Sequence, residues 1–262
     1  MTAASMKRNS EDESMNIVEE VIEEVQGSPD AIDLHIKNIE RVIGGGIPKT
    51  GIYFIVGSSG TYKSSLAYHI CSMNSLDNRG NCLYLTFDQS RNSLLEHFRS
   101  VGLKIVKENK LSIIDISKLR KLVCEESARQ RTMNWFKAII TLIAGYMKDF
   151  PCSFLVIDSM STLLNLSPMV FPQRNMFYFF EEIKALGLTT FMIFDTKAAS
   201  QPLNSAHEYE YLADGVIVLK MVTAGDKVDI KMQIKKMRRV RHDRHFFPLR
   251  IENGEFIIEL NS

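Results

Sequence analysis

The sequence predicts an α/β protein with a mostly parallel central sheet flanked by helices. Apolar runs of strand length recur at residues 51–56, 82–87, 153–157 and 189–194. These runs are nearly continuous and do not alternate with polar residues, which is typical of strands covered on both faces. Segments with helical periodicity stand between them, and this order of strand, helix and strand predicts parallel pairing.

The first helix is expected to begin inside the loop that follows the first strand. Between residues 64 and 73 the apolar side chains fall on one helical face, namely Leu66, Ala67, Ile70 and Met73. Two further segments with helical character, residues 133–147 and 175–186, precede the third and fourth apolar runs. Each strand is therefore reached through a crossover helix, as a parallel sheet requires.

The C-terminal part predicts a different edge of the sheet. Residues 215–221, 227–235 and 255–260 look like closing strands with short connections, so we expect a partly antiparallel edge. Length and an apolar content of 45% indicate one large core, which we assign to residues 30–262. Residues 1–29 are expected to form an acidic tail that could hold a short amphipathic helix.

Composition argues against several classes of protein. The net charge is +1, and the four cysteines have neither C-x-x-C spacing nor a histidine at ligand spacing, so disulfide frameworks and zinc sites are not expected. His69 and His97 stand alone, and we interpret them as ordinary surface or core histidines. No apolar stretch reaches the roughly 20 residues of a membrane span, and no signal peptide is visible. We expect a cytoplasmic protein that does not contact membranes.

A phosphate-binding loop is suggested by residues 57–64, which read GSSGTYKS after the first strand. The pattern G-x-x-x-x-G-K-[ST] holds phosphate with backbone N–H groups and a helix N-terminus, while lysine reaches the β- and γ-phosphates and the next hydroxyl binds Mg²⁺. Tyr62 stands where this pattern has its second glycine. The candidate binding residues are Gly57, Ser58, Ser59, Gly60, Thr61, Tyr62, Lys63, Ser64 and Ser65.

Tyr62 decides whether the loop can work. Glycine lets the backbone pass close to a phosphate and permits angles that other residues resist. A tyrosine fits only if its ring swings outward and its backbone tolerates the turn. The alternative is a ring that occupies the phosphate cradle.

Two acidic residues follow other predicted strands. Asp158 ends the third strand and is placed to hold Mg²⁺ together with Ser64. Asp88, followed by Gln89, ends the second strand. Because parallel strands bring their carboxyl ends to one edge, where α/β folds bind ligands, these side chains are expected near the loop.

Six segments in this order resemble the KaiC-type branch of the RecA superfamily of P-loop NTPases, over roughly residues 32–260. They are GGGIP at 44–48, the strand and loop ending at 65, LYLTFDQS at 83–90, VIDS at 156–159, ADGVIVL at 213–219 and KMR at 236–238. The resemblance implies a single RecA-like core that binds ATP with Mg²⁺.

The resemblance also implies roles for individual residues. Lys63 would grip the phosphates, while Ser64 and Asp158 would serve the metal. Members of the family usually form hexameric rings with nucleotide between subunits, so a homo-oligomer is expected. Lys236 and Arg238 would reach the γ-phosphate bound by the neighbouring subunit, as an arginine finger does.

One family feature is absent. Two adjacent glutamates usually follow the second strand and one of them activates the attacking water, whereas this chain has Asp88 and Gln89. Aspartate is one methylene shorter, and a misplacement of about 1 Å can cost on the order of a hundredfold in rate. Gln89 cannot act as a base. ATP binding is therefore expected, and the sequence leaves useful hydrolysis open.

Residues 235–247 form the densest cationic segment and leave three interpretations open. Lys236 and Arg238 could serve a subunit contact, while the other arginines pair with acidic residues. Alternatively, the segment could track single-stranded nucleic acid, with Phe246 and Phe247 as stacking platforms. For the whole chain three functions remain open: a nucleotide-dependent regulatory or assembly switch, a single-stranded DNA-binding module like a recombinase paralogue, and, if the Tyr62 ring occupies the phosphate cradle, a structural relative that binds no nucleotide.

Overall fold

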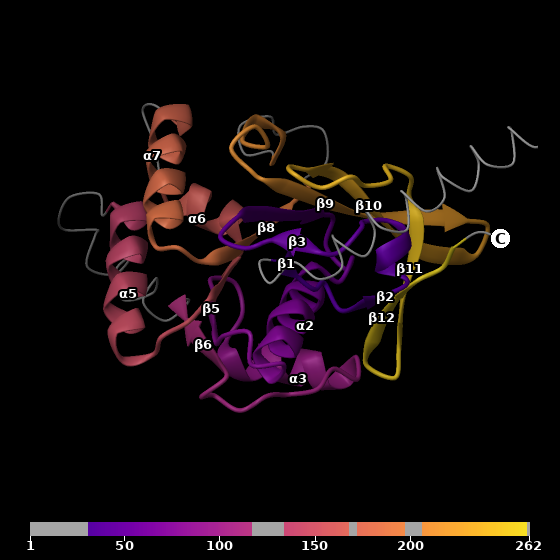
Figure 1. Ribbon diagram of the computed structural model, residues 1–262, viewed down its shortest axis with the longest axis horizontal. Coiled ribbons are helices and arrows are strands. Elements are labelled where there is room, and N and C mark those ends of the chain that lie inside the picture. Colours follow the sequence, from indigo (N-terminus) through magenta and orange to yellow (C-terminus); the bar gives the residue numbers. More distant parts are fainter. Residues whose placement is uncertain (1–30, 117–133, 168–171, 197–205, 261–262) are drawn as a thin grey trace, which may run out of the picture.

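The computed structural model describes residues 31–116, 134–167, 172–196 and 206–260. The predicted acidic tail and its short helix lie outside the described residues. Among the described residues, ten strands form one mixed sheet in the order β2-β12-β11-β10-β9-β4-β8-β7-β5-β6. The predicted α/β architecture with a mostly parallel centre is confirmed, and helices pack on the sheet (Figure 1).

The parallel part of the sheet contains the four strands that were predicted from continuous apolar runs and one further strand, β6. Its members pair in register through β4·β8, β8·β7, β7·β5 and β5·β6. They are β4 (Ile52–Gly57), β5 (Cys82–Thr86), β6 (Leu111–Asp115), β7 (Phe154–Asp158) and β8 (Thr189–Asp195). All residues of β4, β5 and β7 are buried, in keeping with helices on both faces.

The C-terminal strands form the partly antiparallel edge that was expected, with β11 as an additional strand that was not predicted. β9 pairs parallel to β4, and the following strands pair antiparallel to one another. The edge consists of β9 (Gly215–Ala224), β10 (Lys227–Met237), β11 (Phe247–Glu252), β12 (Glu255–Ile258) and β2 (Ile36–Lys37). A separate small sheet joins β1 (Ala31–Ile32) to β3 (Ile47–Pro48), and short 3₁₀ turns occur at η1 (Ile39–Arg41) and η3 (Ala206–Glu208).

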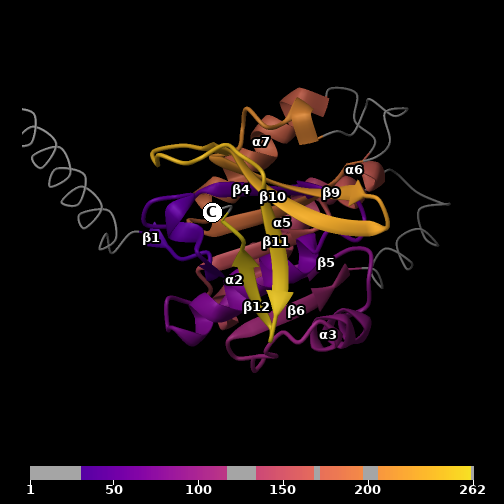
Figure 2. The same ribbon diagram turned by 90° about the vertical axis from the view of Figure 1, so that its right-hand side faces the viewer.

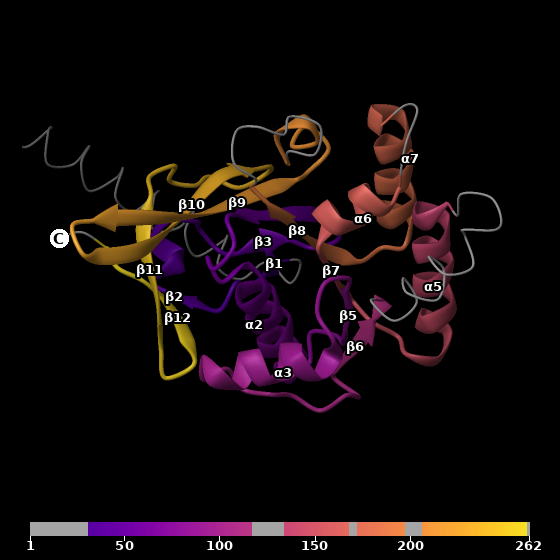
Figure 3. The same ribbon diagram turned by 180° about the vertical axis from the view of Figure 1, so that it is seen from behind.

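Alternating side chains of β4 divide the core into two halves. Tyr53 and Ile55 join the buried cluster beneath α2, whereas Phe54 and Val56 join the cluster on the opposite face. Figures 1 and 3 show the helices distributed accordingly. One face carries α2 (Lys63–Leu76) and α3 (Arg91–Ser100), and the other carries α5 (Trp135–Asp149), α6 (Met160–Leu166) and α7 (Pro172–Ala185). None of the described helices has the length and apolar character needed to cross a bilayer.

The hairpin of β11 and β12 curls over the face that carries α2 (Figure 2). Its Phe256 ring lies 5.2 Å from the His69 ring of α2, measured between centroids. At the hairpin tip, Gly254 approaches Gly102 so closely that a Cβ there would collide with the Gly102 carbonyl oxygen. The antiparallel edge is therefore in contact with α2 and with the turn that follows α3.

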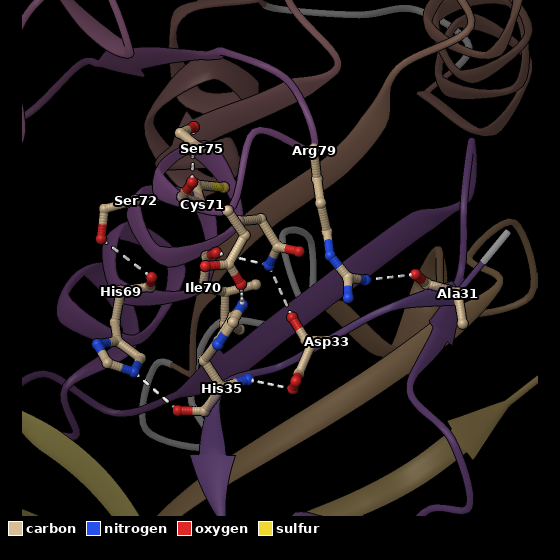
Figure 4. Close-up of polar contacts among 11 residues, drawn as sticks. Ala31, Asp33, His35, His69, Ile70, Cys71, Ser72, Ser75 and Arg79 are labelled. Carbon is tan, nitrogen blue, oxygen red and sulfur yellow. Dashed lines mark hydrogen bonds and ion pairs between the residues drawn. The ribbon is translucent and has the colours of Figure 1, made fainter. Parts of the chain in front are cut away.

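Polar contacts attach the first described segment to α2 and to the turn that follows it (Figure 4). Nε2 of His69 lies 2.8 Å from the carbonyl oxygen of His35 and donates to it, since a carbonyl can only accept. The guanidinium of Arg79 donates to the carbonyl oxygen of Ala31 at 2.9 Å. Burial lowers the pKa of His69, so this core histidine is held neutral, as the sequence interpretation allowed.

Candidate functional site

The predicted loop connects β4 to α2 at the centre of the sheet. β4 ends at Gly57 between neighbours β8 and β9, and α2 begins at Lys63. A Cβ at Gly57 would collide with the carbonyl oxygen of Leu219 on β9 and would approach Oγ1 of Thr61 to 2.6 Å. Only glycine fits at the first position of the loop.

Tyr62 adopts the left-handed conformation, with φ 64° and ψ 22°. Glycine takes these angles without strain, whereas a tyrosine held there costs on the order of 1–3 kcal/mol. The Tyr62 ring is partly buried and packs against the hydrophobic cluster beneath α2. The loop thus keeps a glycine-like backbone with a tyrosine side chain.

An open pocket of about 330 Å³ lies above the loop. It is at the carboxyl edge of the parallel strands, where α/β proteins bind ligands. Residues 59–65 form one wall. The remaining lining residues are Thr86, Asp88, Gln89, His97, Asp158, Ile193 and Asp195.

Lys63 lies at the bottom of this pocket and is only 7% exposed. Its ammonium nitrogen donates to the carbonyl oxygen of Ser58 at 2.7 Å and lies 2.8 Å from Oδ1 of Asp195. Asp195 is the last residue of β8, directly opposite Gly57 in the sheet register. Asp195 was not among the site residues predicted from the sequence, although it ends an apolar run in the same way as Asp158.

Asp158 ends β7 and is almost fully buried at 8% exposure. The hydroxyl of Tyr84 donates to its Oδ2 at 2.6 Å, and the Ser64 side chain is also hydrogen-bonded to it. Burial raises the pKa of Asp158, the hydrogen bonds from Tyr84 and Ser64 oppose this rise, and the charges of Asp88 and Asp195 add to it. The predicted neighbours Ser64 and Asp158 are therefore brought together.

Asp88 lies at the entrance of the pocket, and both of its carboxylate oxygens accept hydrogen bonds. Ser159 donates to Oδ2 at 2.9 Å, and Thr162 donates to Oδ1 at 2.6 Å. Ser159 follows Asp158 through a cis peptide bond and caps α6. The Asp88 carboxylate is thus held toward the start of α6.

His97 was interpreted as an ordinary histidine, but it lines this pocket from α3. Its Nε2 lies 3.1 Å from Oγ of Ser65. The contact forms because α2 and α3 pack on the same face of the sheet, and no spacing in the sequence signals it.

Lys236 and Arg238 do not line the pocket. The ammonium group of Lys236 donates to the carbonyl oxygens of Glu210 and Ala213 at 2.7 and 2.6 Å. Arg238 lies 3.4 Å from Oδ1 of Asp214, whose Oδ2 accepts from the backbone N–H of Ile52. Since Ile52 begins the strand that the loop follows, Lys236 and Arg238 lie at the opposite edge of the sheet, roughly 16 Å of strand away.

The three surplus arginines of the basic segment, Arg239, Arg241 and Arg244, are exposed. None of them forms an ion pair with another described residue, whereas Lys235 pairs with Glu210 at 2.7 Å. Phe246 is 37% exposed with the Lys220 ammonium 6.0 Å from its ring centroid. Phe247 packs against the core instead, so it is not available as a stacking platform.

The pocket combines the parts that an anion and a hard cation need. It is lined by a helix N-terminus and the buried Lys63 ammonium, which suit an anion, and by the side-chain oxygens of Ser64 and Asp158, which suit a cation. No group of three or more His, Cys, Asp or Glu side chains in the described part of the chain is arranged as a metal cage. Oxygen pairs of this kind suit Mg²⁺, which proteins usually hold through one or two carboxylates together with phosphate and water.

Comparison with known proteins gives a consistent result. A model of the KaiC ATPase family matches residues 32–261. The circadian clock oscillator protein KaiC of Picosynechococcus sp. is 25% identical over 229 residues, which are 83% of this chain and 42% of that protein. KaiC of Rippkaea orientalis is 26% identical over 228 residues, with the same coverage. The chain thus spans less than half the length of these curated relatives.

A solved structure shares the fold. A KaiC-like protein from the hyperthermophilic archaeon Pyrococcus horikoshii superposes with a TM-score of 0.69 at 20% identity, covering 88% of this chain and 99% of that chain. Because the family model spans most of the sequence, and the fold and loop agree with it, this chain belongs to the KaiC ATPase family of nucleotide-binding proteins with a RecA-type core.

Proposed function

We propose that this chain binds ATP with Mg²⁺ and changes its conformation or assembly with the nucleotide state, as a regulatory switch. The observation that carries the proposal is the open pocket with the Lys63 ammonium at its base and the Ser64–Asp158 oxygen pair beside it. Loop N–H groups and Lys63 would hold the phosphates, and Ser64 and Asp158 would hold the metal. When bound, Mg²⁺ would neutralise phosphate charge.

Weak hydrolysis is part of the proposal. Asp88 is the residue at the place of the catalytic carboxylate, but it is shorter than the glutamate usual there and both its oxygens already accept hydrogen bonds. Asp88 would have to give up one of these hydrogen bonds in order to position the attacking water. Lys236 and Arg238 are far from the pocket of their own chain, so charge stabilisation would need a second subunit.

A homo-oligomer, such as a hexameric ring with nucleotide between subunits, would provide this second subunit. Its interface would bring the edge with Lys236 and Arg238 of one subunit to the loop of the next. Light scattering with and without ATP·Mg tests this part of the proposal directly. A mass that stays monomeric in both conditions at micromolar concentration would contradict it.

Calorimetric titration with ATP·Mg tests the main proposal. Wild type is expected to bind, and Lys63→Ala is expected to lose binding while keeping its melting temperature near that of wild type. Lys107→Ala, which removes an exposed lysine that does not line the pocket, is the matched control and should bind like wild type. A wild-type protein with no measurable heat and no thermal shift would refute the proposal.

A second function, binding of single-stranded nucleic acid, is favoured by one observation only. Arg239, Arg241 and Arg244 are exposed and unpaired among the described residues, next to exposed Phe246. Reversing the three charges should abolish binding of an oligonucleotide at low salt, and wild-type affinity should fall steeply with salt. Indifference of wild type to oligonucleotides would end this alternative.

A further inference from the structure

Asp195 holds one of the hydrogen-bond donors that a nucleotide needs from Lys63. The ammonium group of lysine has three N–H donors and no acceptor. One donor serves the carbonyl oxygen of Ser58 at 2.7 Å, and a second serves Oδ1 of Asp195 at 2.8 Å. One donor therefore remains for phosphate.

The number of free donors matters because a diphosphate and a triphosphate require different numbers of hydrogen bonds from Lys63. In a phosphate-binding loop the lysine reaches both the β- and the γ-phosphate. A diphosphate needs one donor from Lys63, which is available without disturbing Asp195. A triphosphate needs two, so Lys63 must release the carboxylate.

The sheet keeps Asp195 at this place. Its Cα is paired with that of Gly57 in the register of β4 and β8. Its backbone N–H donates to Oγ of Ser161 at 2.9 Å, and the N–H of Thr196 donates to the Gly57 carbonyl oxygen at 2.9 Å. Since β4 and the side chain of Ser161 in α6 both hold the backbone here, the carboxylate stays beside the loop.

Electrostatic repulsion within the pocket also disfavours the triphosphate. Among the described residues that line the pocket, Lys63 is the sole Lys or Arg, whereas Asp88, Asp158 and Asp195 all face it. Any phosphate oxygen that Lys63 contacts would lie within about 6 Å of Asp195, a distance at which like charges repel appreciably. The additional charge of a triphosphate increases that repulsion.

We propose that Asp195 makes this pocket prefer a nucleoside diphosphate over a triphosphate, by occupying a Lys63 donor that only the triphosphate requires. The proposal rests on the nucleotide-binding function proposed above. It assigns the switch to a defined exchange in which Lys63 is either paired with Asp195 or bound to two phosphates. The diphosphate is then the resting ligand of the isolated chain.

Calorimetric titration of nucleotide-free protein with ADP·Mg and with a non-hydrolysable ATP analogue and Mg²⁺ tests the proposal. Wild type should bind ADP more tightly than the triphosphate. Asp195→Asn keeps an acceptor oxygen but removes the charge, so its hydrogen bond to Lys63 is weaker and easier to release. It should tighten triphosphate binding roughly fivefold or more while changing ADP affinity less than about twofold. Asp195→Glu keeps the charge and should retain the wild-type preference.

A matched control is Asp226→Asn, which removes the same charge from an exposed turn and should change neither affinity. Should Asp195→Asn fail to fold, the small neutral Asp195→Ser replaces it. Equal tightening for both ligands, or weaker triphosphate binding, would overturn the role of Asp195 while leaving nucleotide binding intact. If neither wild type nor variant binds either ligand, the proposed function fails, and this inference fails with it.

Discussion

The hydroxyl of Tyr84 donates a hydrogen bond of 2.6 Å to Oδ2 of Asp158 in the interior of the sheet. Both side chains are buried, and they come from adjacent strands, β5 and β7. The hydrogen bond fixes the orientation of the carboxylate and leaves its other oxygen for a different partner. Burial raises the pKa of Tyr84, so its hydroxyl keeps the proton that it donates.

Tyr84→Phe is expected to raise the Mg²⁺ concentration needed for ATP binding, because Asp158 loses the group that orients it. A hydrogen bond to a charged group contributes about 1.5–3 kcal/mol to stability, so the melting temperature should also fall. The measurement is a Mg²⁺ titration at fixed ATP. Tyr146→Phe removes a comparable hydrogen bond to Ser112 away from the pocket and should leave the Mg²⁺ requirement unchanged.

Variants at Tyr62 distinguish the role of its backbone from that of its ring. Tyr62→Gly should keep ATP affinity within about threefold, because the backbone already has glycine-like angles. Tyr62→Val should weaken binding about tenfold, because a β-branched residue resists φ 64°. Calorimetry reports the affinities, with Tyr62→Phe as the conservative control. A Val variant that binds as well as the Gly variant would show that the loop does not need this conformation.

Phosphate release by the same Tyr62→Gly protein addresses turnover. Faster release at unchanged affinity would identify the tyrosine as a brake on hydrolysis. Loss of binding in Tyr62→Gly would instead show that the packed ring is required to hold the loop.

The parts of the fold that could be predicted from sequence are those with a strong periodic signal. β4, β5, β7 and β8 are continuously apolar because helices cover both faces, so each was recognisable. β6 was missed because only Leu111, Ile113 and the residue after the strand, Ile116, are buried at this edge of the sheet. α3 was missed because it buries little more than Leu94 and Phe98, and the rest of its surface is polar.

The residues of the pocket, too, could be predicted only where the sequence carries a local signal. Strand ends can be recognised locally, so Asp158 and Asp88 could be placed near the loop. Asp195 carries the same local signal and was overlooked for lack of a motif. Tyr84 could not have been found, because its phenol is buried within a strand and its partner lies 74 residues away in the sequence.

The buried His69 side chain should make the stability of the folded protein depend on pH. Burial lowers its pKa in the folded state, so the folded protein binds its proton less readily than the unfolded chain does. The stability that neutral His69 provides is present above the unfolded pKa of about 6.5 and is lost as the pH falls below it. Thermal melts should show a smaller loss between pH 7.5 and 5.5 in His69→Gln than in wild type. His207→Gln, an exposed control, should behave like wild type.

Mixing two inactive variants tests whether Lys236 and Arg238 act across a subunit boundary. Lys63→Ala chains lack the loop lysine, and Arg238→Ala chains lack the arginine, so each alone should release little phosphate. In an equal mixture about a quarter of the interfaces of a head-to-tail ring would combine an intact loop with an intact arginine, and activity should reappear. Arg250→Ala, which removes another exposed, ion-paired arginine, should retain activity by itself. If Arg238 acted within its own chain, no chain in the mixture would be complete, and phosphate release would stay at the level of the separate variants.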